Sequence, residues 1–246
     1  MTLASDDPVA VELVEAIHAG DTRSLQRLLD ENPGLAPARL GDGKGGSRTT
    51  LHVAADWPGY FPDGPAIVAL LAGAGANPGS PVTGSWHSET PLHWAASSDD
   101  LDVADALIDA GADLEAPGAS IAGGTPLDDA VGYGCWHAAR RLVERGARVD
   151  KLWHAAALGM LTRTRELLDQ DPPPAPDEIN NAFWQACHGG QRRVAELLLA
   201  RGADVNWIPG YAERTPLEAA DGLDTRRDLL VTWLREHGAR SARPPD

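Results

Sequence analysis

The chain has 246 residues, of which 43% are hydrophobic and 23% charged, as in an ordinary globular protein. Its formal net charge of −15 argues against nucleic acid and anionic membrane as partners, because binding either needs a basic face. The charge fits a basic partner, or solubility alone. No apolar run of about 18 residues that could span a bilayer is present in the sequence.

Residue usage bears on the location of the protein. The opening MTLASDDPVA lacks the basic segment and apolar core of a signal peptide, so we expect a cytoplasmic protein. The two cysteines, Cys135 and Cys187, are interpreted as small buried thiols rather than as a disulfide. Arginine far outnumbers lysine, and alanine, glycine and proline are frequent, which favours a GC-rich bacterial source.

Two short amphipathic helices are predicted within residues 8–40. Leu13 and Ile17 lie on one face of the first, Gly20 marks the turn, and a second apolar pattern follows it. The next stretch, GDGKGGS at 41–47, is rich in glycine but lacks the spacing and the flanking strand of a phosphate-binding P-loop. We therefore predict a hairpin finger there.

Residues 57–65, WPGYFPDGP, are predicted to form a stiff loop. Three aromatic residues are mixed there with prolines and glycines, which disfavour a helix. Two positions are considered for this loop. It packs on the shoulder of the neighbouring helices, or it covers part of the inner surface of the fold as a partial lid.

Residues 88–114, SETPLHWAASSDDLDVADALIDAGADL, carry the clearest local pattern. Thr90 is a good N-cap, and Pro91 suits the first helical position, where its missing N–H costs nothing. Apolar spacing predicts one helix on each side of the Ser97–Asp100 break, and Gly111 is placed to end the second helix in the left-handed conformation. This helix–turn–helix unit is too small to bury its own apolar faces, so it needs neighbours.

The pattern recurs along the chain. T-P-L returns at Thr125 and Thr215, and the variant TTLHVAA begins at Thr49. These segments resemble the ankyrin repeat, whose signature is T-P-L-H-x-A with a period near 33 residues. The resemblance implies an all-α solenoid of about seven helix–turn–helix repeats with short hairpin fingers, forming a single domain over residues 1–246. The repeats are expected at 8–40 (N-terminal cap), 48–81, 88–120, 124–150, 151–176, 180–211 and 213–240 (C-terminal cap), with the proline run at 172–176 replacing one finger.

The resemblance also implies a binding surface, because fingers and first helices line a concave face in ankyrin repeat proteins. Aromatic residues in such a row are the kind that dominate binding energy at interfaces. The expected binding residues are Trp57, Trp86, Trp94, Asp129, Tyr133, His154, Gln185, His188 and Tyr211. Trp153, Trp184 and Trp233 match packing positions instead and are expected in the core.

His52 and His93 occupy the histidine of T-P-L-H, which the resemblance implies to be structural, bridging neighbouring backbones. Later repeats have other residues there, including Asp128, Trp184 and Glu218. The inter-repeat hydrogen bonds are therefore expected to be less regular from the fourth repeat onward.

Asp129 and His154 occupy equivalent positions in adjacent expected repeats. Helices packed about 8–10 Å apart would let the carboxylate orient the imidazole, and with His188 this group could serve general acid–base catalysis. The alternative is a hydrogen-bonded pair on a wet binding surface. No local motif specifies a nucleophile, and His87, His154 and His188 lack the short spacing of metal ligands, so neither a metal nor a cofactor is expected.

Two functions remain open from the sequence. The first is a cytoplasmic module that recognises a protein partner through its concave, aromatic-rich face, a basic partner fitting the charge. The second is a small-molecule-binding protein or an enzyme, with Asp129 and His154 as an acid–base pair and the loop at 57–65 closing over the groove. Neither nucleic acid nor a membrane is expected as a partner.

Overall fold

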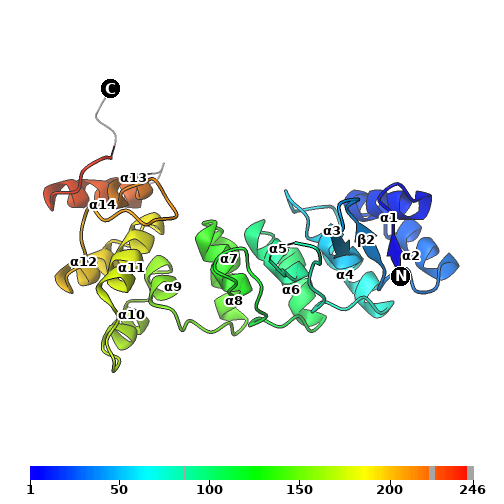
Figure 1. Cartoon of the computed structure of the whole chain (residues 1–246), viewed down its shortest axis with the longest axis horizontal. Helices are drawn as coiled ribbons and strands as arrows, with labels where there is room; N and C mark the ends of the chain where they lie inside the picture. Colours follow the sequence, from blue (N-terminus) through cyan, green and yellow to red (C-terminus); the bar gives the residue numbers. More distant parts are fainter. Residues whose placement is uncertain (86, 222–224, 243–246) are drawn as a thin grey trace. The chain divides into compact units, whose positions relative to one another are not determined.

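The computed structural model describes residues 1–85, 87–221 and 225–242. The chain forms two compact units, Met1–Ala147 and Arg148–Asp246 (Figure 1). Within the described residues the helices form seven consecutive pairs, four in the first unit and three in the second, which confirms the predicted all-α repeat architecture. No helix in this described part of the chain is long and apolar enough to cross a membrane.

The first unit has two layers of helices. The layer of first helices holds α1 (Pro8–Ala19), α3 (Thr50–Ala54), α5 (Pro91–Ser97) and α7 (Pro126–Gly132). The layer of second helices holds α2 (Thr22–Glu31), α4 (Gly64–Gly73), α6 (Leu101–Asp109) and α8 (Trp136–Glu144). Successive helices of each layer contact one another (Figure 1). Leucines such as Leu51, Leu92 and Leu127 are buried between the layers, so each repeat completes the core of its neighbour.

The threonine–proline openings explain where the inner helices begin. Thr90 is the N-cap of α5, and Pro91 is its first residue, as predicted. The His93 side chain accepts a hydrogen bond from the Thr90 backbone N–H at 3.0 Å. In the next repeat Asp128 takes over this role and accepts from the Thr125 N–H at 2.7 Å.

The T-P-L-H histidines also connect repeats, as expected. His52 Nδ1 accepts from the Thr49 N–H, so its Nε2 carries the proton and donates to the Glu89 carbonyl at 3.1 Å. The Nε2 of His93 lies 3.4 Å from the Gly124 carbonyl in the same way. Asp128 keeps the cap through its contacts with the Thr125 N–H and hydroxyl.

A small sheet forms at the N-terminal end of the first unit. β1 (Thr2–Leu3) runs parallel to β2 (Arg39–Gly41), which pairs antiparallel with β3 (Ser47–Thr49). The turn between β2 and β3 is held by Asp42, whose Oδ1 accepts from the backbone N–H groups of Lys44 and Gly46 at 2.8 and 2.9 Å. The glycine-rich stretch at 41–47 is therefore the predicted hairpin finger.

The loop at 57–65 is docked onto two different repeats. The Phe61 ring stacks on the His18 ring of α1 with centroids 4.2 Å apart. The Tyr60 backbone N–H donates to the Asp100 carboxylate at 2.5 Å, next to the start of α6. Trp57, at the other end of the loop, is 80% exposed. The loop thus packs on the shoulder of the repeats and also presents one aromatic side chain to solvent.

The second unit continues the pairing of helices. Its first helices are α9 (Leu152–Ala157), α11 (Pro176–His188) and α13 (Pro216–Ala219), and its second helices are α10 (Leu161–Leu168), α12 (Arg192–Ala200) and α14 (Thr225–Glu236). α11 contacts both α9 and α13. The proline run supplies its first residue, Pro176, and the Glu178 side chain accepts from the Ala175 N–H at 2.8 Å. α11 therefore begins before residue 180, where the sequence places the start of that repeat.

Trp184 restores in the second unit the link that the histidines make in the first. Its indole Nε1–H donates to the Arg214 carbonyl at 2.8 Å. Arg214 directly precedes the N-cap Thr215, just as Glu89 precedes Thr90. The irregularity expected from the missing histidine is thus compensated at this position by a different donor.

Candidate functional site

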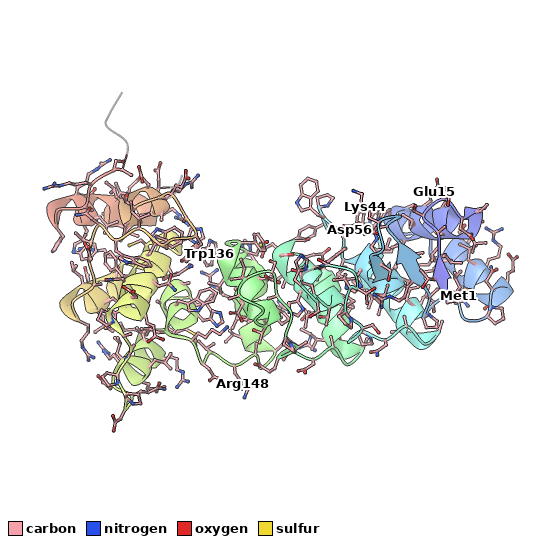
Figure 2. The ribbon with its side chains drawn as sticks, viewed as in Figure 1. Met1, Glu15, Lys44, Asp56, Trp136 and Arg148 are labelled. Atoms are coloured by element: carbon pink, nitrogen blue, oxygen red, sulfur yellow. The ribbon has the colours of Figure 1, made fainter. Side chains whose placement is uncertain are left out.

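A hollow of about 510 Å³ opens on the surface of the first unit. It lies among the end of α5, the residue that ends α7, the loop at 57–65, and the segments that precede α5 and α7. Asp56, labelled in Figure 2, follows α3 at its edge. The residues lining the hollow are Asp56, Trp57, His87, Glu89, Trp94, Ser97, Ser98, Ser120 and Tyr133.

Three aromatic residues of the predicted row border this hollow. Trp57 and Tyr133 are 80% and 55% exposed, so their rings remain available to a partner. Trp94 is half-buried; its ring packs edge-on against the His52 ring at 4.9 Å between centroids. The Trp94 indole N–H donates to the Glu89 carboxylate at 3.1 Å. Trp94 is thus fixed in place while Trp57 and Tyr133 project outward.

Glu89 is a buried carboxyl group in the hollow. Only 9% of its side chain is exposed. Besides the Trp94 indole, it accepts from the Ser120 backbone N–H at 3.3 Å, and its Oε2 lies 3.0 Å from His87 Nδ1. These partners are neutral donors and one histidine. Within the described part of the chain, no lysine or arginine pairs with Glu89.

Asp129 lies behind the hollow and is completely buried. Its Oδ1 accepts from the Ser120 hydroxyl at 2.9 Å and from the Ile121 N–H at 3.1 Å. The Ser120 hydroxyl in turn lies 2.9 Å from the Tyr133 hydroxyl. Oδ2 of Asp129 accepts no hydrogen bond from a described group, although the Asp129 and Glu89 carboxyls are close enough to bond when one carries a proton.

Burial raises the pKa of the Asp129 carboxyl from 3.8 to about 7. The hydrogen bonds from Ile121 and Ser120 act in the opposite direction, and the nearby Glu89 carboxylate raises the pKa further. The Asp129 carboxyl therefore gains or loses its proton near neutral pH.

A second group of predicted residues lies in the second unit. Gln185 donates to the Tyr211 hydroxyl at 3.2 Å, and that hydroxyl donates to Asn181 at 2.6 Å. The Tyr211 ring also packs edge-on against Trp184 at 5.8 Å. His188, at the end of α11, has a pKa lowered to about 4 by burial and by the charges of Arg227 and Arg214.

Trp86 and His154 are the predicted residues that remain. Trp86 falls outside the described residues. Asp129 belongs to the first unit and His154 to the second, where His154 is almost fully buried on α9 and its ring packs 4.1 Å from that of Trp153. In the residues that the structure describes, no three His, Cys, Asp or Glu side chains converge as metal ligands.

Of the tryptophans expected in the core, Trp184 and Trp233 are each only 6% exposed. Trp153 is half-buried. The packing interpretation of the first two is therefore matched by their burial.

Sequence reasoning missed the polar floor of the hollow. Glu89 directly precedes the T-P-L-H motif, and its carbonyl is the acceptor for His52, which ties its backbone to the neighbouring repeat. Ser120 lies in the segment before α7. The sequence signal that could have identified this floor is the acidic residue immediately before the motif threonine, because that residue lies where the finger meets the first helices.

The geometry can hold a polar or charged group against Glu89 while apolar atoms contact the aromatic rings. A chain of hydrogen bonds runs from the Asp129 carboxyl through the Ser120 hydroxyl to the Tyr133 hydroxyl. Near this group, the half-buried Cys135 thiol has its pKa raised to about 11 by burial.

Comparisons with known proteins agree with this architecture. A model of ankyrin repeats in three copies matches residues 51–151, and a model of the single ankyrin repeat matches residues 179–208. The structure is similar to the human ASB11 ankyrin repeat domain, with a TM-score of 0.54, 18% identity, and coverage of 95% of this chain and 99% of that one. It is also similar to the ankyrin repeat domain of Bcl-3, a member of the IkappaB protein family. That match has a TM-score of 0.50 and 24% identity, and covers 91% of this chain and 97% of the other.

At these identities the structural likeness shows a shared fold alone. No curated protein matches the sequence. The two family models, however, together match just over half of the chain, and they cover repeats in both compact units. The chain therefore belongs to the ankyrin repeat family.

Proposed function

We infer that this protein is a cytoplasmic binding module that recognises a protein partner through the aromatic hollow of its first unit. Ankyrin repeats generally mediate protein–protein interaction, so the family favours this class of function. The single observation that carries the proposal is the convergence of Trp57, Trp94 and Tyr133 on one open hollow with polar groups beneath them. Aromatic anchors around a polar centre are typical of interface hot spots.

Exposure distinguishes this surface from ordinary core packing. Trp57 and Tyr133 leave large parts of their rings in solvent, at a cost that folding alone does not require. Gln185, His188 and Tyr211 are proposed as additional contacts on the second unit, where Tyr211 is 64% exposed. The cytoplasmic location is supported by the two free cysteines, since a reducing compartment keeps thiols unpaired.

Affinity capture from the lysate of the native host tests the proposal. The wild-type protein is compared with a Trp94→Ala/Tyr133→Ala variant and with Leu229→Ala, which removes an exposed apolar side chain on α14. Circular dichroism first establishes that all three are folded. We expect a stoichiometric protein retained by the wild type and by Leu229→Ala and lost with the double variant. Equal retention by all three proteins would exclude the hollow as the binding surface.

A further inference from the structure

Among the described residues, the acidic floor of the hollow has a histidine neighbour but no lysine or arginine partner. Glu89 is nearly buried, yet the described groups that contact its carboxylate are the Trp94 indole, the Ser120 N–H and His87. Together with the adjacent Asp129 carboxyl, these groups can occupy the acceptor positions of Glu89, but none of them carries the permanent positive charge of a lysine or arginine. Burying a carboxylate without a cation is costly, and proteins normally pair such groups with lysine or arginine.

Asp129 is a second buried carboxyl next to the hollow. Its side chain is completely buried, and its Oδ2 accepts no hydrogen bond from the described residues. It is linked through Ser120 to the wall of the hollow, and it lies beside Glu89. A positive group in the hollow would favour the ionised form of the Asp129 carboxyl.

The other acidic residue at the hollow is already paired. Asp56 forms an ion pair with Arg48, so the charge at that edge is neutralised within the protein. Of the two carboxylates that line the hollow, only Glu89 therefore lacks a lysine or arginine partner among the described residues. The rings of Trp57, Trp94 and Tyr133 stand around the same opening, and their electron-rich faces attract cations.

We propose that this hollow binds an arginine side chain of the protein partner, with the guanidinium against Glu89 and its flat face against the aromatic walls. The inference rests on the proposed function, since the arginine belongs to that partner. A guanidinium fits better than an ammonium because it is planar, stacks on aromatic rings and carries several N–H donors. The serines at the mouth, Ser97 and Ser98, offer further acceptors for those donors. The net charge of −15 would help to attract a basic segment.

A titration with a small arginine analogue tests the proposal on the intact protein. The probe is N-acetyl-arginine methylamide, followed by NMR through the indole N–H resonance of Trp94, which is assigned from its absence in Trp94→Phe. We expect a saturable shift with an affinity in the millimolar range, as suits one cationic side chain at a partly exposed site. The citrulline analogue, which has the same shape without the charge, should produce a much smaller shift.

Glu89→Gln is the decisive variant, and Glu15→Gln on α1 is its matched control. Both remove one negative charge, but Glu15 lies outside the hollow (Figure 2). Glu89→Gln should weaken probe binding roughly tenfold, whereas Glu15→Gln should change it less than twofold. If Glu89→Gln does not fold, Trp57→Ala replaces it, because the exposed Trp57 ring can be removed without disturbing the core.

Three results would overturn the proposal. The first is the absence of a saturable shift, and the second is binding of the citrulline analogue, or of the corresponding lysine analogue, as tight as that of the arginine probe. The third is an unchanged affinity for the arginine probe in the folded Glu89→Gln variant. These results are distinct from failure of the proposed function. Probe binding without any protein captured from the lysate would refute the interaction role alone. A captured protein that binds Glu89→Gln as tightly as the wild type would refute the arginine assignment alone.

Discussion

His52 shows how one buried side chain couples helix capping to repeat stacking. It is fully buried, and its two ring nitrogens link Thr49 of its own repeat to the Glu89 carbonyl of the next. This role follows from the T-P-L-H motif and was predicted from the sequence. Burial lowers the pKa of His52 to about 3, so the neutral ring is the form that folds.

The pH dependence of stability should reveal this histidine. In the unfolded chain His52 takes up a proton near pH 6.5, whereas in the folded protein it does so only near pH 3. Its contribution is thus complete above about pH 6.5 and is lost as the pH falls below that value. We predict that urea denaturation finds His52→Gln less stable than wild type at pH 7.5. The free energy of unfolding of His52→Gln should also fall less steeply towards pH 5 than that of the wild type. The two slopes should differ by about 1.4 kcal/mol per pH unit. Parallel pH profiles would contradict this prediction.

Asp129 should show the opposite pH behaviour. Its pKa is raised in the folded protein, so the folded state holds a proton that the unfolded chain has released. The contribution of Asp129 to the stability of the folded protein is complete below about pH 4 and is lost as the pH rises towards 7. Asp129→Asn keeps an acceptor for Ser120 and should gain about 1 kcal/mol or more relative to wild type between pH 5 and pH 8. Glu15→Gln serves as the control, and a difference independent of pH would refute the assignment.

At the scale of single elements, the starts of the helices could be predicted and their later contacts could not. Thr90 and Pro91 specify a helix start through local chemistry alone. The docking of Phe61 on His18 depends on a contact between distant segments, which no local pattern encodes. Trp184 was expected in the core, but its role as an inter-repeat donor depends on the position of the Arg214 carbonyl.

The Trp184 hydrogen bond can be isolated by a matched pair of variants. Trp184 and Trp233 are each 6% exposed, but only the Trp184 indole makes a hydrogen bond among those found in the described residues. Trp184→Phe should therefore cost about 1–2 kcal/mol more than Trp233→Phe in chemical denaturation, because it leaves the Arg214 carbonyl unpaired. Equal losses would mean that ring volume, rather than the hydrogen bond, explains the effect.

The packing of the loop at 57–65 against α1 can be tested by substituting one glycine. Gly20 ends α1 with a φ of 66°, and a Cβ there would lie 2.3 Å from the Pro62 carbonyl oxygen. Gly34 also has a positive φ, of 89°, but nothing lies within 4 Å of its added Cβ. Gly20→Ala should therefore lower the free energy of unfolding by about 1–3 kcal/mol more than Gly34→Ala does. The difference should be visible as a lower thermal unfolding temperature. Similar losses would place the loop elsewhere.

At the scale of the whole molecule, the sequence predicts the repeat architecture because each repeat reproduces the same local signals. It places Trp57, Trp94 and Tyr133 on the expected binding face of successive repeats, and all three line one hollow. The acidic floor could not be predicted in the same way. Glu89 and Ser120 come from the segments between helices, whose course is set by packing rather than by periodicity.

The central claim is that this hollow binds a protein partner, and the most direct measurement is the affinity of the purified partner by isothermal titration calorimetry. Trp57→Ala is the best variant, because the ring is 80% exposed and its loss should leave the fold intact. Leu229→Ala is the control. The account predicts that Trp57→Ala weakens binding at least about tenfold while Leu229→Ala leaves it within about twofold. An affinity of Trp57→Ala within about twofold of wild type would contradict it.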